Sequence, residues 1–138
     1  MSMFKVFDVA GSAMNAQSVR LNVTASNLAN AGSVNGDPEK VYRARQPVFA
    51  SFGESLATAK SGVAGVRLDG IVESDAPLKL QHQPEHPDAD ENGNVYVSNV
   101  NTVEEMVNMM SASRSYQNNV EMINTAKDML LQTLSLGR

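Results

Sequence analysis

The side chains best suited to binding a metal lie close together between Asp88 and Asn94. This stretch places carboxylate or amide oxygens at alternate positions and a glycine at the sixth, as the first half of a calcium-binding EF-hand loop does. The twelfth position is Asn99 rather than a bidentate glutamate, and Pro84 and Pro87 disfavour an entering helix. A calcium- or metal-binding module that uses the Asp88–Asn94 loop is therefore the secondary hypothesis. The competing interpretation is a polar turn that leads into a strand.

Other kinds of chemistry have less support. His82 and His86 are four residues apart, a spacing that could pair two metal ligands on a helix, but the nearby prolines indicate a loop. The chain has no cysteine, so disulfide and thiolate chemistry are excluded. No serine lies in the G-x-S-x-G pattern of a nucleophile elbow. The leading interpretation is a protein that is not an enzyme, with no catalytic residue, cofactor or metal.

The elements that would position any site are two long helices at the ends of the chain. Apolar residues recur there at a spacing of seven, which keeps them on one slowly drifting face of a helix. We predict helices over about 3–31 and 102–136 that pack antiparallel, in the manner of a coiled coil. The residues expected to form this intrachain seam are Phe7, Met14, Leu21 and Leu28 with Met109, Tyr116, Ile123 and Leu130.

Both predicted helices also carry a second apolar stripe on roughly the opposite side. A helix that folds against one core needs a single stripe, so a second stripe indicates a second set of neighbours. We expect those neighbours to be other chains; a single helix hairpin with ragged edges is the alternative. The predicted intersubunit face consists of Val9, Val19 and Val23 with Val107, Met122, Met129 and Leu136.

The residues between the helices have the pattern of short strands. Alternating apolar residues predict strands over about 41–52 and 66–72, with shorter ones near Leu80 and Val95, and a small polar loop over 53–65. The predicted fold class is α+β, in which antiparallel terminal helices flank a small β-rich insert. We divide the chain into an N-terminal helix (1–32), the insert (33–100) and a C-terminal helix (101–138), with the two helices forming one domain.

Composition narrows the range of partners. The net charge of −4 and the pI of about 5.1 come without a basic stripe, which argues against nucleic acid. No apolar run approaches the roughly 18 residues that a transmembrane helix needs, so no direct membrane insertion is expected. Lys5 and Asp8 interrupt the start of the chain, which does not have the pattern of a secretory signal. Export, if it occurs, would use a route without a cleaved signal peptide.

Most of the sequence resembles the bacterial flagellar axial proteins. Residues 7–13 and 17–31, which include the run from Ala25 to Ala31, are similar to the N-terminal motif of that family, and Tyr42-Arg43-Ala44 to its continuation. Residues 86–93 and 99–101 resemble the central signature of the proximal-rod branch, and residues 105–117 and 134–138 its C-terminal helix. The connection over residues 32–41 is longer than the short turn common in the family.

The resemblance implies a structural subunit of the flagellar basal-body proximal rod, which polymerises through its terminal helices and transmits motor torque. The implied partners are other copies of the chain, other rod proteins, the flagellar type III export apparatus, and inner-membrane ring and adaptor proteins near the rod base. The implied location is the rod in the periplasmic space. A coiled-coil adaptor or chaperone of a secretion system is a third hypothesis beside the rod subunit and the metal-binding module.

Overall fold

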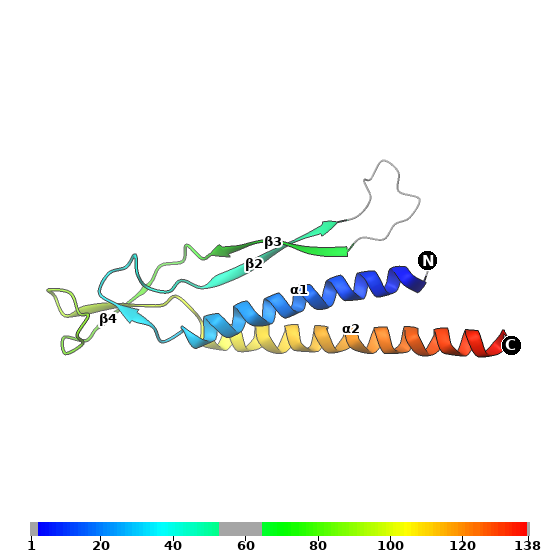
Figure 1. Cartoon of the computed structure of the whole chain (residues 1–138). Coiled ribbons are helices and arrows are strands. Elements are labelled where there is room, and N and C mark those ends of the chain that lie inside the picture. The colour runs from blue at the N-terminus through cyan, green and yellow to red at the C-terminus, as the bar shows by residue number, and fades with distance from the viewer. Residues whose placement is uncertain (1–2, 53–64, 138) are drawn as a thin grey trace.

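The computed structural model describes residues 3–52 and 65–137 (Figure 1). The elements in chain order are α1 (Met3–Ala29), β1 (Val34–Asn35), β2 (Arg45–Phe52), β3 (Gly65–Glu73), β4 (Lys79–His82), β5 (Asn94–Val97) and α2 (Thr102–Leu136). Two terminal helices with a β-rich region between them are therefore confirmed. The loop predicted over 53–65 lies outside the described residues, apart from its last residue.

Helix α2 begins and ends at the predicted bounds of 102 and 136. Asn101 caps it, because its side-chain oxygen accepts a hydrogen bond from the backbone N–H of Val103 at 3.2 Å. Glu104 and Glu105 lie in the first turn, where the helix dipole favours negative charge. At about 1.5 Å per residue, its 35 residues span about 52 Å. Helix α1 is shorter and ends two residues before the predicted boundary.

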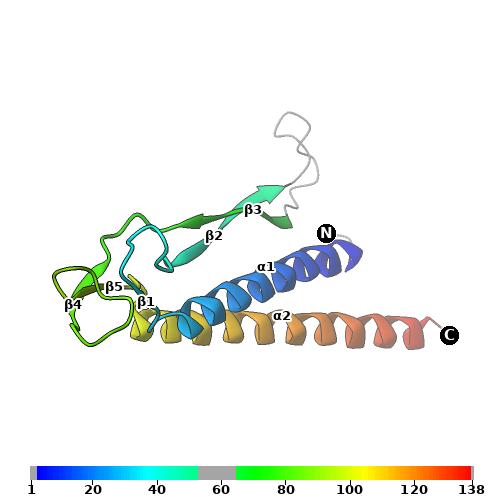
Figure 2. The same cartoon turned by 60° about the vertical axis from the view of Figure 1, so that its left-hand side comes forward.

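The two helices lie side by side, with the start of α1 near the end of α2 (Figures 1 and 2). At the other end of the pair, Arg20 donates a hydrogen bond to the side-chain oxygen of Asn108 at 3.2 Å. The buried apolar residues of both helices are mostly small, which lets the two backbones approach closely. They are Ala10, Ala16, Val23, Ala112 and Ala126.

The strands form two separate small sheets. Strands β2 and β3 pair antiparallel as a hairpin, with a register irregularity between Val48 and Phe49. Pro47 fits there because β2 is an edge strand, where a missing N–H costs no ladder hydrogen bond. The hairpin lies along the side of α1 that faces away from α2 (Figures 1 and 2). The second sheet has the order β1-β5-β4 and lies at the end of the molecule where α2 begins.

One amide side chain attaches the start of the hairpin to α1. Asn27, which is only 1% exposed, donates to the carbonyl oxygen of Arg45 at 2.8 Å and accepts from the N–H of Arg45 at 2.9 Å. The hydroxyl of Tyr42 donates to the same Asn27 oxygen at 2.8 Å. Farther along the hairpin, the Ser12 hydroxyl accepts a hydrogen bond from the N–H of Val66 at 3.2 Å. Two points along α1 therefore fix the direction of the hairpin.

Replacing Asn27 by alanine should destabilise the chain by about 2–4 kcal/mol, because both backbone groups of Arg45 would lose this partner and the Tyr42 hydroxyl would keep only the Ser26 hydroxyl at 3.3 Å. Urea denaturation followed by circular dichroism would measure this change. Asn15→Ala is a matched control, since Asn15 is exposed on the same helix, and it should change stability by less than about 0.5 kcal/mol. Equal unfolding midpoints for the two variants would contradict the role assigned to the Asn27 amide.

Candidate functional site

The Asp88–Asn94 loop is built as a hydrogen-bonded turn. One carboxylate oxygen of Asp90 accepts hydrogen bonds from the N–H groups of Asn92 at 2.9 Å and Asn94 at 2.8 Å. Gly93 has φ of +74°, a left-handed conformation that suits glycine. The backbone oxygen of Asp88 lies so close to Gly36 that a side chain at Gly36 would collide with it. The loop therefore packs against the connection that follows α1.

The metal-binding hypothesis finds no support in this geometry. Nδ1 of His82 lies 3.1 Å from the side-chain oxygen of Asn94, and Nδ1 of His86 accepts a hydrogen bond from the N–H of Asp88 at 3.1 Å. In the described ranges, no group of three or more histidine, aspartate or glutamate side chains is arranged to hold a metal ion. The turn interpretation explains Asp90, Asn92 and Gly93 without a ligand.

The residues predicted for the intrachain seam are mostly half-buried. This holds for Phe7, Met14, Leu21 and Leu28 on α1 and for Met109, Ile123 and Leu130 on α2, whereas Tyr116 is 38% exposed. The most deeply buried positions of α2 are others, namely Glu105, Ala112 and Ala126. These three residues belong to one series of positions spaced seven residues apart, in which the remaining position, Asn119, is only half-buried. The sequence analysis missed Ala112 and Ala126 because it followed only the large side chains.

The residues predicted for the intersubunit face are exposed on α2 but at least half-buried on α1. On α2 its members Val107, Met122, Met129 and Leu136 are all exposed, up to 85% for Leu136. On α1, Val9 and Val19 are half-buried and Val23 is only 8% exposed. Val19 and Val23 line a crevice of about 260 Å³ with Ile71 of β3. The chain's own hairpin therefore covers this side of α1, and Val23 is not open to another chain, which corrects the expectation for that residue.

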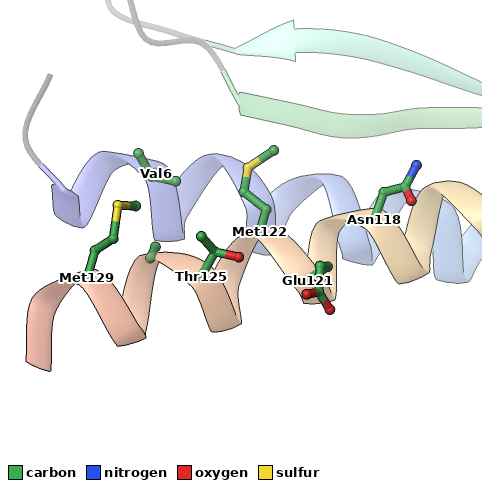
Figure 3. Close-up of a pocket in the computed structure, with 7 residues that line it drawn as sticks. Val6, Asn118, Glu121, Met122, Thr125 and Met129 are labelled. Carbon is green, nitrogen blue, oxygen red and sulfur yellow. The ribbon is translucent and has the colours of Figure 1, made fainter. Parts of the chain in front are cut away.

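A second hollow opens where α1 and α2 diverge. The helices separate toward the start of α1 (Figures 1 and 2), and a groove of about 450 Å³ lies between them. Val6 lines it from α1, and Met122, Thr125, Ala126 and Met129 line it from α2, with Asn118 and Glu121 at one end. Figure 3 shows that Met122 and Met129 extend toward α1, whereas Glu121 points away from it. We call this hollow the groove.

Beyond the groove, α2 continues past the start of α1 without a companion helix (Figures 1 and 2). All residues from 131 to 137 are exposed, including Leu131 at 55% and Leu134 at 67%. We call residues 131–137 the tail. Exposed apolar side chains in such number favour a surface that is covered in the functional state. Neither described helix is long and apolar enough to cross a membrane.

Comparisons with known proteins identify what this chain is similar to. Residues 7–36 match the family model described as flagella basal body rod protein, and residues 91–136 match the model described as flagellar basal body rod FlgEFG protein C-terminal. The flagellar basal-body rod protein FlgC of Salmonella typhimurium (strain LT2) is 52% identical over the full length of both chains. The FlgC protein of Yersinia enterocolitica is 50% identical over the full length of both chains. The FlgC protein of Buchnera aphidicola subsp. Acyrthosiphon pisum is 46% identical over 99% of both chains.

Backbone protection should fall along α2 in the isolated chain, because its first turns pack on α1, whereas its tail is exposed in the described part of the structure. In native-state hydrogen exchange, we expect amides near Ala112 to exchange several-fold more slowly than those near Leu134. Uniform protection from residue 105 to residue 136 would mean that the tail has a partner within one chain.

Proposed function

The chain belongs to the FlgC family of flagellar basal-body rod proteins, and we propose that it is built into the proximal part of the rod, where it transmits motor torque. It is a structural subunit of the rod and not an enzyme. The observation that carries this conclusion is the identity of 52% with a curated FlgC protein over the complete length of both chains. The long helices at both ends of the chain and the exposed apolar face of α2 support the same role.

Within one subunit, the two terminal helices would act as one antiparallel, coiled-coil-like unit. Phe7, Met14, Leu21 and Leu28 would face Met109, Tyr116, Ile123 and Leu130 across its seam. The hydrogen bond between Arg20 and Asn108 and the position of Val6 beside Met122 and Met129 support this pairing, since both follow from opposite helix directions. The division into residues 1–32, 33–100 and 101–138 follows from the same proposal, with the insert as a separate β-rich part.

Assembly would use the faces that this helix pair leaves uncovered. Val107, Met122, Met129 and Leu136 on α2 would meet neighbouring subunits, with Val9 and Val19 of α1 at the margin of the contact. The exposure of the four α2 residues supports this role, because large apolar side chains on a helix gain free energy when a partner removes them from water. A tubular rod requires heterologous contacts that do not close on themselves. The neighbours would be other copies of this chain and other rod proteins.

The route to the rod is also part of the proposal. We expect the chain to cross the inner membrane unfolded, through the flagellar type III export apparatus and without a cleaved signal peptide. It would then assemble in the periplasmic space above the inner-membrane ring and the adaptor proteins at the rod base. The sequence has no cysteine, so no disulfide would have to be reduced before export. The small buried side chains of the helix pair favour easy unfolding, because each buries little apolar area.

Complementation tests the proposed function. A strain that lacks its own FlgC should regain motility when it produces this chain, and the chain should be present in its detergent-extracted basal bodies. Cryo-electron microscopy of those basal bodies would locate it in the rod. Motility that is restored while the chain is absent from the rod would contradict a structural role.

Substituting Met129→Glu should block assembly while changing the fold of the chain little. Met129 is half exposed in the isolated chain, so a carboxylate there stays hydrated until a neighbour covers it. Burying this carboxylate against a neighbour without a compensating partner would cost several kcal/mol. Amounts of the chain in isolated basal bodies and swimming in soft agar measure the effect. Met129→Leu is the matched control and should assemble normally; normal rods with glutamate at 129 would mean that this face is not an interface.

A further inference from the structure

We propose that the groove receives the tail of a second copy of this chain. The proposal rests on the proposed rod function, because it specifies which surfaces join two subunits. It assigns the groove lined by Val6, Met122, Thr125 and Met129 as the receiving site. It assigns Leu131 and Leu134, the large exposed side chains at the start of the tail, as the inserted residues.

The groove is the open continuation of a helix–helix contact. Ala126 is only 3% exposed and belongs to the buried repeat of α2, yet it also lines the groove. The contact between α1 and α2 therefore leads directly into the groove at the point where α1 diverges from α2. An element that continues this packing has to fit between two helices at close approach, which favours a third helix. A volume of about 450 Å³ has room for more than one side chain.

The tail has the properties that such an occupant needs. No residue from 129 to 137 is charged, so this part of the tail would bring no ionised side chain into the groove. Its two hydroxyl groups are already paired: Thr133 donates to the carbonyl oxygen of Met129 at 2.8 Å, and Ser135 to that of Gln132 at 2.7 Å. Leu131 and Leu134 are three residues apart and therefore neighbours on one side of the helix. The tail therefore offers apolar side chains together with two hydroxyl groups that already have partners.

The positions of the two features favour a contact between copies that point the same way. The groove and the tail lie at the same end of the molecule (Figures 1 and 2). A tail cannot enter the groove of its own chain, because the tail continues the straight helix that forms one wall of that groove. Groove and tail are different surfaces, so the contact is heterologous and each copy keeps one of them free for the next. Copies related by a rotation and a small shift along one axis would satisfy this geometry.

Photo-crosslinking in assembling cells tests the contact. A benzophenone amino acid placed at Leu134 abstracts hydrogen readily from carbon next to sulfur, and the groove holds Met122 and Met129. After illumination and isolation of basal bodies, we expect an adduct of twice the mass of the chain. Peptide mass spectrometry should locate the second attachment point within residues 3–10 or 118–129 of the other copy. The same probe at Leu80, which is exposed on β4 at the opposite end of the molecule, should give no adduct with these residues.

A variant that fills the groove separates this contact from other contacts of the tail. Thr125 is exposed on the groove wall, so Thr125→Trp should occupy the groove without disturbing the buried residues of α2, and the adduct should be lost. Thr125→Val is the matched control and should retain the adduct. An adduct that survives Thr125→Trp, an adduct with a different rod protein, or assembled rods without any adduct would each overturn the proposal and leave the rod function intact. A chain absent from basal bodies would overturn both.

Discussion

The amide of Asn27 is the interaction on which the arrangement of the chain depends. It pairs with both the N–H and the carbonyl oxygen of Arg45, as the backbone of a neighbouring strand would, although Asn27 itself lies in a helix. This pairing holds the first residue of β2 against α1, and the Ser12 hydroxyl holds β3 farther along the same helix. Because the hairpin is fixed at two points, it covers one side of α1 while α2 covers another. Helix α1 thus lies between the hairpin and α2, whereas α2 contacts α1 on one side and is otherwise exposed.

This division explains why the apolar surface is so unevenly exposed. The buried side chains between the helices include Ala10, Ala112 and Ala126, which allow close approach but each remove little apolar area from water. The larger side chains of α2 stay at the edges of this contact or outside it. A single chain therefore leaves exposed to water much of the apolar surface that could stabilise its helix pair further. Neighbouring subunits in a rod would supply the missing contacts, so folding and assembly would be energetically linked.

The sequence predicted the elements better than their contacts. Helix α2 was predictable because apolar residues recur at a spacing of seven from Met109 to Leu130, and most of the strands were predictable from local alternation. Strand β1, only two residues long, was not predicted. The burial of Val23 was not predictable, because nothing in the nearby sequence indicates that a hairpin beginning some 20 residues later folds back onto the same helix. The sequence analysis assigned Val23 to other chains for that reason. Asn27 was recognised as part of a family motif, but its hydrogen bonds join residues 18 apart, which a sequence pattern does not specify.

Assembly through apolar helices also raises the question of register. A uniform stripe with a repeat of seven could bind a neighbouring helix equally well after a shift of about 10 Å, because the same pattern recurs at that interval. Charged pairs could prevent such slippage, but residues 129–137 of α2 carry no charge. The divergence of α1 from α2 breaks the repeat instead, since it opens the groove beside Met122 and Met129. The shape of the groove, rather than charge on residues 129–137, would then set how far each subunit is displaced from the next.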